Sequence, residues 1–254
     1  MGAMNEQQPA ISPPGTIEYE HGVAIPGVIK PQAEWARTAL KHLPDGALDW
    51  QALFGRSAPL VLELGCGNGR YTLMSALARP DCDHLGSDIL AAAIRYATRR
   101  ANQRGLHNVR FAVKDAETLL RRHIATGSVA EIHVYHPQPF HDPREARHRL
   151  LTPEFLADVH RALRPGGLFV TQTDSPEYWA YMRRVLPAFF DFHEQQGPWP
   201  DAPEGRSRRE IVARSRDLPV FRCYGVRRDG LTAEGLAELV RGLPRPTFRT
   251  HRPG

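Results

Sequence analysis

Short apolar runs alternate with longer segments of mixed apolar and polar residues along most of this chain. Runs rich in Val, Leu, Ile and Phe predict buried strands, because parallel strands covered on both faces read as continuous apolar stretches. The strands are expected at residues 59–64, 84–88, 109–113, 128–135, 168–173 and 219–226. Helices are expected at residues 32–43, 70–78, 91–103, 115–123, 153–164, 176–186 and 233–241. This alternation predicts a doubly wound α/β fold with a largely parallel sheet.

The chain divides into three parts by composition. Residues 1–30 are rich in Pro, Gly and Glu and show no periodicity, which predicts a flexible N-terminal arm. Residues 31–228 carry the strand and helix pattern and are expected to form one domain, since 254 residues with 41% hydrophobic content suit a single core. Residues 229–254 are expected to form a tail with one small helix.

Composition also narrows the class of protein. No apolar run approaches the roughly 20 residues that a membrane-spanning helix needs, so no membrane partner is expected. The cysteines Cys66, Cys82 and Cys223 are odd in number and lack metal-ligand spacing, which fits the reducing cytoplasm. We therefore expect a cytoplasmic protein, either a monomer or a homodimer.

Three glycines at alternate positions stand between the first predicted strand of the core and the helix that follows it. Gly65, Gly67 and Gly69 allow the backbone to turn tightly and to approach a ligand closely. This pattern predicts a cofactor-binding turn, although a glycine triplet alone is weak evidence.

Acidic residues follow three successive strands and strengthen that prediction. Glu63 stands just before the glycines, Asp88 ends the second strand 19 residues after Gly69, and Asp115 ends the third strand. Asp88 is placed to accept both hydroxyls of a ribose, and Asp115 to accept from an adenine amino group. The structural alternatives are that Glu63 caps a turn and that Asp115 caps the next helix.

A dinucleotide site is a second interpretation of the same turn. Its G-x-G-x-x-G pattern would place the third glycine one residue later than Gly69, and the pyrophosphate would lie near Glu63. A carboxylate suits a ligand that carries a sulfonium and an ammonium group better than it suits pyrophosphate. The sequence therefore favours S-adenosylmethionine.

The distribution of basic residues leaves two interpretations open. The chain has 33 Lys and Arg against 28 Asp and Glu, a net charge of +5, which is mild for a nucleic-acid-binding protein. Arginines gather at residues 144–149 and 206–216. They form either a contact surface for RNA phosphates or an arginine-rich surface that is simply solvated.

Residues 48–228 resemble the bacterial tRNA (guanine-N7)-methyltransferases. The similar segments are residues 52–63, 136–144, 151–156, 163–167, 173–178 and 207–210. The resemblance implies a Rossmann-like class I methyltransferase fold, with a mostly parallel seven-stranded sheet and helices on both faces. It also implies S-adenosylmethionine as the cofactor, S-adenosylhomocysteine as its product, no metal, and tRNA as the partner.

Roles for individual residues follow from the resemblance. The cofactor-binding set is Glu63, Gly65, Gly67, Gly69, Asp88, Asp115, Ala116 and His136. The substrate-binding set is Gln138, Asp142, Arg144, Arg147, Asp174, Ser207 and Glu210, with Gln138 and Asp174 as the catalytic candidates. Phosphate contacts are expected from Arg144, Arg147, Arg149, Arg208 and Arg209.

The chain departs from the family pattern in the segment after the fourth strand. Gln138 stands where the family has an aspartate, Asp142 where a lysine is usual, and Phe140 where a tryptophan is usual. These changes keep two alternatives open. One is an N-methyltransferase of a small azaheterocycle or purine-like metabolite. The other is a binding module that lost catalysis, against which the intact glycine turn argues.

The implied reaction does not require a catalytic base. N7 of guanine has a free lone pair and no proton to lose, so transfer needs alignment and a dry pocket rather than a general base. Four histidines, His133, His136, His141 and His148, lie close in sequence, but the prolines among them argue against a metal site.

Overall fold

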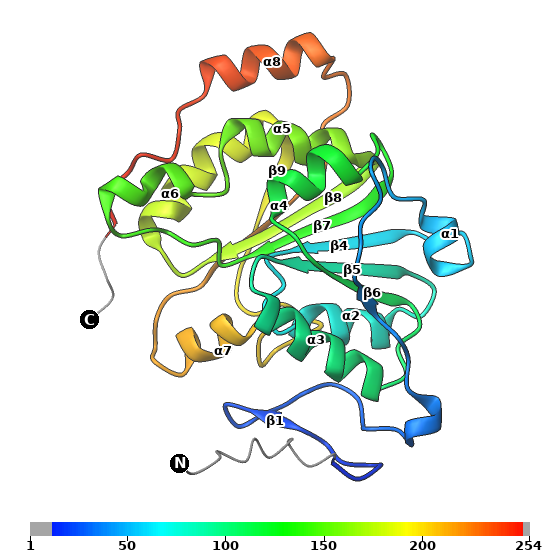
Figure 1. Ribbon diagram of the computed structural model, residues 1–254. Coiled ribbons are helices and arrows are strands. Elements are labelled where there is room, and N and C mark those ends of the chain that lie inside the picture. The colour runs from blue at the N-terminus through cyan, green and yellow to red at the C-terminus, as the bar shows by residue number, and fades with distance from the viewer. Residues whose placement is uncertain (1–11, 251–254) are drawn as a thin grey trace, which may run out of the picture.

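The computed structural model describes residues 12–250, which are built around one twisted sheet (Figure 1). Its eight strands are ordered β3-β6-β5-β4-β7-β8-β10-β9. The five pairings from β3 to β8 are parallel, and β10 runs antiparallel to both β8 and β9. The strands are β3 (Ala39–Leu40), β4 (Leu60–Leu64), β5 (Asp83–Asp88), β6 (Val109–Val113), β7 (Val129–Tyr135), β8 (Leu163–Thr173), β9 (Phe190–Gln195) and β10 (Phe221–Arg227).

Helices cover both faces of this sheet (Figure 1). The helices are α1 (Trp50–Phe54), α2 (Arg70–Ala78), α3 (Ala91–Gln103), α4 (Ala116–Thr118), α5 (Pro153–Ala162), α6 (Pro176–Val185), α7 (Arg208–Arg214) and α8 (Ala233–Gly242). One core lies between the sheet and α5 and α6, and includes Leu62 and Phe155. A second core lies between the sheet and α2 and α3, and includes Leu73 and Phe111.

The predicted fold class is confirmed, with an additional edge strand. β3 gives the sheet an eighth strand, where the resemblance implied seven. The helix predicted at residues 32–43 is wrong: the chain forms a short 3-10 turn at Gln32–Glu34 and then β3. Phe111 donates its backbone N–H to the Thr38 carbonyl at 2.8 Å, and Ala39 pairs with Phe111. Pairing with the open edge of β6 therefore overrides the local helical pattern.

Several other elements differ from the prediction. β9 and α7 were not predicted, and β8 begins at Leu163 instead of residue 168. The helix predicted at residues 115–123 is the single turn α4, followed by the π-helical turn η2 (Leu119–His123). The other predicted core strands and helices are present, within a few residues of their expected ends.

The described part of the predicted N-terminal arm is packed against the domain and is not a flexible arm. A two-stranded hairpin forms from β1 (Tyr19–Glu20) and β2 (Val23–Ala24). Ile25 and Ile29 are both 1% exposed, and Arg104 of the segment after α3 binds Glu18 at 2.9 Å. This correction concerns residues 12–30, since residues 1–11 lie outside the described part.

The C-terminal segment contains the expected helix, α8, which packs against α5. The residues after α8 are also held. Arg149 donates to the carbonyls of Pro246 and Phe248, each at 2.7 Å, and the Phe248 ring lies 5.3 Å from that of Tyr178. Residues 251–254 lie outside the described part. Among the helices of residues 12–250, none has the length and apolar character to cross a membrane.

Candidate active site

The glycine turn, residues 65–69, connects β4 to α2. Gly65, Gly67 and Gly69 have φ values of 73°, 53° and 75°, in the left-handed region that favours glycine. A Cβ on Gly69 would lie 2.8 Å from that of Ala97, so this glycine lets α2 pack closely on α3. A Cβ on Gly65 or Gly67 would meet no atom within 4 Å. These two glycines therefore border open space.

Glu63 lies at the end of β4, directly before the glycine turn, and is 3% exposed. Its Oε2 accepts the backbone N–H of Thr72 at 3.0 Å and also the Thr72 hydroxyl. Burial raises the pKa of Glu63 to about 8, although both hydrogen bonds oppose that rise and nearby Asp88 adds to it. A cationic ligand beside Glu63 would therefore favour the ionised carboxylate.

Asp88 and Asp115 lie at the ends of the next two strands. Asp88 accepts the backbone N–H of Gly67 at 2.9 Å and that of Leu90 at 2.8 Å, which ties the glycine turn to β5. Asp115 is the N-cap of α4 and accepts the Thr118 N–H at 2.7 Å. This agrees with the alternative interpretation of the sequence, in which Asp115 caps the next helix. Burial raises the pKa of Asp115, but its hydrogen bonds with Thr118 and the nearby Lys114 charge together lower it. Carboxylate oxygens have two lone pairs each, so both residues retain acceptor capacity.

Three adjacent parallel strands bring these acids to one edge of the sheet. β4 pairs with β5, and β5 with β6, so that Glu63 lies opposite Gly86 and Asp88 opposite Val113. Ala116 begins α4 immediately after Asp115. The acceptor set matches the ammonium, ribose hydroxyls and adenine amino group of S-adenosylmethionine, and the open side of the glycine turn gives it room. The residues of this cofactor cluster therefore fit that ligand.

A second cluster lies at the ends of β7 and β8 and is centred on Asp174. His136 Nδ1 donates to Asp174 Oδ1 at 3.2 Å, and Arg209 donates to Asp174 Oδ2 from Nη2 at 2.6 Å. The Gln172 amide nitrogen lies 3.0 Å from His136 Nε2, so that Nε2 accepts and the proton stays on Nδ1. Trp199 Nε1 donates to Gln172 Oε1 at 2.5 Å and fixes the amide orientation.

Charge partners keep Asp174 ionised. Burial raises the pKa of Asp174, but the His136 hydrogen bond and the Arg209 charge outweigh it and lower the pKa to about 2. His136 was expected in the cofactor-binding set, and its side chain is instead engaged by Asp174 and Gln172. His136 and Phe140 have φ values of 50° and 44°. Non-glycine residues rarely adopt this backbone, and such strain gathers at functional sites.

Glu210 is buried in an ion pair, which differs from the expectation that it holds the substrate. It is 0% exposed, and its Oε1 accepts from Arg222 at 2.5 Å and 2.9 Å. Its Oε2 accepts from the Gln172 amide at 3.0 Å and the Arg206 N–H at 2.8 Å. Ser207 is the N-cap of α7 and accepts the Glu210 N–H at 3.1 Å. Ser207 and Glu210 thus form a variant of the capping box that starts α7.

The remaining predicted substrate residues lie on the loop and 3-10 turn after β7. Gln138 is exposed, and Asp142 caps the turn Pro143–His148 and binds Arg144 at 2.6 Å. The Asp142 side chain therefore stabilises its own loop, and the Arg144 guanidinium neutralises its charge. Arg147 is exposed and lies 3.2 Å from His148 Nε2.

The expected phosphate contact of Arg149 is wrong. This side chain is 2% exposed and donates to four backbone carbonyls of two chain segments, residues 139–140 and 246–248. Burial explains the correction, because four of the five guanidinium donors bind backbone carbonyls and the side chain is closed off from a phosphate outside the protein. Arg208 and Arg209 are exposed on α7, although Arg209 is already paired with Asp174.

Gln172, Arg206 and Arg222 were not predicted as individual site residues. Arg206 donates to the Tyr135 hydroxyl at 3.0 Å and to Asp201 at 2.7 Å, joining the loop before α7 to β7. A weak signal existed for Arg222, since a charged residue lies between Phe221 and Cys223 in a predicted strand. Its partner Glu210 was not predictable, because the pairing depends on how α7 meets β10.

The four histidines near β7 have separate surroundings. His133 is buried beside Glu131 and Tyr71, His136 binds Asp174, and His141 lies 2.9 Å from the Thr250 hydroxyl. Burial lowers the pKa of His133 to about 4, although Glu131 opposes the shift. Within residues 12–250, no three His, Cys, Asp or Glu side chains are grouped as metal ligands.

Comparisons with known proteins agree with this arrangement. The profile of a family described as "Putative methyltransferase" matches residues 57–218. The chain is 36% identical over 178 residues to a tRNA (guanine-N(7)-)-methyltransferase of Arthrobacter sp. (strain FB24), covering 66% of this chain and 56% of that relative. It is 38% identical over 157 residues to the Chloroflexus aggregans protein of the same name, covering 61% of this chain and 70% of the relative.

Solved structures share the fold. The 16S rRNA methyltransferase KamB superposes with a TM-score of 0.55 at 18% identity, covering 75% of this chain and 98% of KamB. A 16S rRNA (adenine(1408)-N(1))-methyltransferase of Catenulisporales acidiphilia, with its cosubstrate SAM, gives a TM-score of 0.51 at 18% identity, covering 76% and 96% of the two chains.

Proposed function

This chain belongs to the methyltransferase family that includes the tRNA (guanine-N(7)-)-methyltransferases, and from this premise we propose that it methylates N7 of a guanine in tRNA with S-adenosylmethionine as donor. The observation that carries the proposal is the combination of this membership with acidic groups at the ends of β4, β5, β6 and β8. A tRNA substrate would place the enzyme in the cytoplasm.

The cofactor cluster would hold the donor by its cationic and hydroxyl groups. Glu63 attracts the cationic methionine portion, Asp88 accepts from the ribose, and Asp115 accepts from the adenine at the start of α4. When bound, S-adenosylmethionine supplies a methyl group on a sulfonium. The open face of Gly65 and Gly67 sets how closely the backbone approaches the donor.

Asp174 would grip the target guanine. The Watson–Crick edge of guanine presents N–H donors, and an ionised carboxylate accepts them with charge-assisted bonds about twice as strong as neutral ones. With a pKa of about 2, Asp174 is charged at every physiological pH. His136 and Arg209 each bind one Asp174 oxygen and fix the carboxylate plane, while a second lone pair on each oxygen stays available.

The protein's contribution to the rate is alignment. N7 of guanine already has its lone pair, so no residue needs to remove a proton before attack. Holding the two reactants in line can supply roughly 7–11 kcal/mol of the barrier. Gln138 lies exposed on the strained loop between His136 and Phe140 and would contact the base through a neutral amide. We expect it to bind the substrate less tightly than the aspartate usual in the family.

The test is a methyl-transfer assay with labelled S-adenosylmethionine and unmodified tRNA, followed by nucleoside analysis of the labelled product. A matched control tRNA carries 7-deazaguanosine in place of guanosine, which keeps the Watson–Crick edge but removes N7. We expect transfer to the first tRNA and none to the second. Transfer to the deaza tRNA, or transfer to a small purine-like heterocycle while tRNA stays unlabelled, would refute the proposal.

A further inference from the structure

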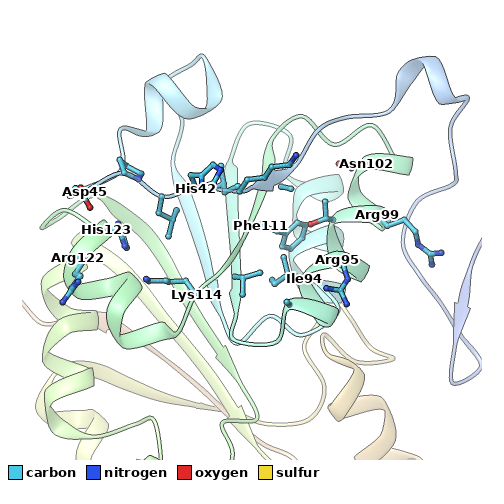
Figure 2. A pocket seen from close by; sticks show the side chains of 18 of the residues that line it. His42, Asp45, Ile94, Arg95, Arg99, Asn102, Phe111, Lys114, Arg122 and His123 are labelled. Carbon is cyan, nitrogen blue, oxygen red and sulfur yellow. The ribbon is translucent and has the colours of Figure 1, made fainter. Parts of the chain in front are cut away.

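A cavity of about 1200 Å³ lies at the β3 and β6 edge of the sheet, outside the two clusters described above (Figure 2). Its walls are the segment from β3 to Gly46, the exposed side of α3, and η2. None of the residues predicted to bind cofactor or substrate lines it. It adjoins the cofactor cluster, because Lys114 in its wall directly precedes Asp115 and donates its backbone N–H to the Asp88 carbonyl at 3.0 Å.

Hydrogen bonds hold the walls of the cavity in place. The Thr38 hydroxyl and backbone N–H each lie 2.9 Å from Asn102 Oδ1, which fixes the start of β3 to α3. His123 Nδ1 lies 3.1 Å from the Gly46 carbonyl, and Leu48 donates to the His123 carbonyl at 2.9 Å, which fixes the other end to η2. The cavity is therefore preformed.

The rim of the cavity is strongly basic. Figure 2 shows positive side chains on three walls, including Arg95 and Arg99 from α3, Lys114 after β6 and Arg122 from η2. Lys41 lies beside His42 on the loop after β3, so the lining holds five cations against one carboxylate, Asp45.

Most of these cations have no protein partner. Arg99 lies 3.7 Å from Glu18, but no ion pair or side-chain hydrogen bond within residues 12–250 engages Lys41, Arg95 or Arg122. An arginine close to the cavity has a different surrounding. Arg121, the neighbour of Arg122 in η2, binds Asp158 at 2.7 Å.

The floor of the cavity is apolar. Ile94 and Phe111 are buried beneath it, and Val113 is 49% exposed at its edge. A concave apolar floor with unpaired cations around it suits a ligand with a flat apolar group between separated negative charges. A nucleotide segment of RNA has this chemistry, since its bases stack and its phosphates repeat along the chain.

We propose that this basic cavity is a second RNA-binding site, which holds a nucleotide segment of the substrate by its phosphates while the target guanine occupies the Asp174 cluster. The inference rests on the proposed function for the identity of the RNA. Cations on separate walls of the opening suit the repeated phosphates of a polyanion. The site therefore contributes to RNA affinity and not to the chemical step.

A triple variant tests the proposal. Lys41→Gln, Arg95→Gln and Arg122→Gln remove three exposed cations of the rim and leave Lys114, next to the cofactor cluster, in place. The matched control combines Arg164→Gln, Arg184→Gln and Arg241→Gln, which are exposed residues at the start of β8, on α6 and on α8. Both variants lose three positive charges, and a thermal melt confirms that each is folded.

Binding of unmodified tRNA is measured from 50 to 300 mM salt. Losing three phosphate contacts should make the slope of log K against log salt shallower by about 2 to 3 and weaken binding by about 100-fold near 0.1 M salt. For the cavity variant we expect this loss, a raised KM for tRNA, and unchanged kcat and S-adenosylmethionine affinity. The control variant should bind as the wild-type protein does.

Other results would overturn the inference. An unchanged affinity and slope in the cavity variant would refute it while leaving the proposed function intact. An equal loss in both triple variants would also refute it, because the effect would be one of overall charge. If wild-type protein binds tRNA through the cavity but transfers no methyl group, the cavity site stands and the proposed function fails.

Discussion

Replacing Arg222 with methionine should strongly destabilise the protein, although the residue lies outside the predicted active site. Arg222 is 6% exposed on β10, and its partner Glu210 on α7 is 0% exposed. The substitution keeps the volume of the side chain but leaves the Glu210 carboxylate buried with only the Gln172 amide and the Arg206 N–H as donors.

The expected magnitude follows from the cost of an unpaired buried charge. Removing one partner of a buried ion pair costs about 3–5 kcal/mol. In a protein of this size each kcal/mol lowers the melting temperature by roughly 2–4 °C. The Arg222→Met variant should therefore melt roughly 6–20 °C below the wild-type protein.

A double variant separates the effect of the unpaired charge from the effect of altered packing. Adding Glu210→Gln to Arg222→Met removes the buried charge, and the amide oxygen still accepts from Gln172 and Arg206. One unsatisfied amide N–H₂ costs about 1–3 kcal/mol, so the double variant should be more stable than Arg222→Met alone. Glu210→Gln by itself should again cost about 3–5 kcal/mol, because it leaves Arg222 unpaired.

Thermal and urea unfolding at pH 7, without cofactor or RNA, measure these differences. If Arg222→Met melts within 2 °C of the wild-type protein, or if the two single effects simply add in the double variant, the ion pair is not the anchor of α7. Glu210 would then be free to contact substrate, as the sequence suggested.

Three further results are expected. Gly67→Ala and the matched control Gly127→Ala both place alanine at a positive φ with open space around the Cβ, so each should cost about 1–2 kcal/mol in thermal unfolding. Only Gly67→Ala should weaken S-adenosylmethionine binding, by about tenfold or more in calorimetry, and equal binding by both variants contradicts the role of the glycine turn. The folded-state pKa of Glu63, about 8 against an ordinary 4.5, means that the unliganded protein loses stability as pH rises from 4.5 to 8. Glu63→Gln should flatten that fall in urea unfolding, and a profile parallel to wild type would show that Glu63 is not its source. Asp174→Asn should lower kcat/KM for tRNA about tenfold, because hydrogen bonds to a charged group exceed neutral ones by about 1–1.5 kcal/mol, and an unchanged value would remove Asp174 from the site.

The sequence predicted the centre of the fold well. The bounds of α2, α3 and β6 match the expected residues, because apolar runs and helical periodicity are local signals. The glycine turn and the acids after β4, β5 and β6 were also found from the sequence. Parallel strands with a regular order place their carboxyl ends together, so the cofactor cluster follows from the strand pattern alone.

The substrate side was predicted less completely. Asp174 was identified, but its partners His136 and Arg209 were expected to contact the cofactor and RNA phosphates instead. Gln172, which binds His136, was not identified. Glu210 and Arg149 have residue types that suit ligand contacts, yet both are buried and bound to the protein. Sequence reasoning cannot tell a buried ionisable residue from an exposed one when its partner lies on a distant segment.

By itself the sequence determined the order of the central strands and helices, the glycine turn and the three acids behind it, since each depends on residues close together in the chain. Only the tertiary structure decided that residues 39–40 extend the sheet, that Arg149 and Glu210 point inward, and that five cations surround one cavity. These features arise where segments far apart in sequence meet, and burial and pairing energies there outweigh local preference.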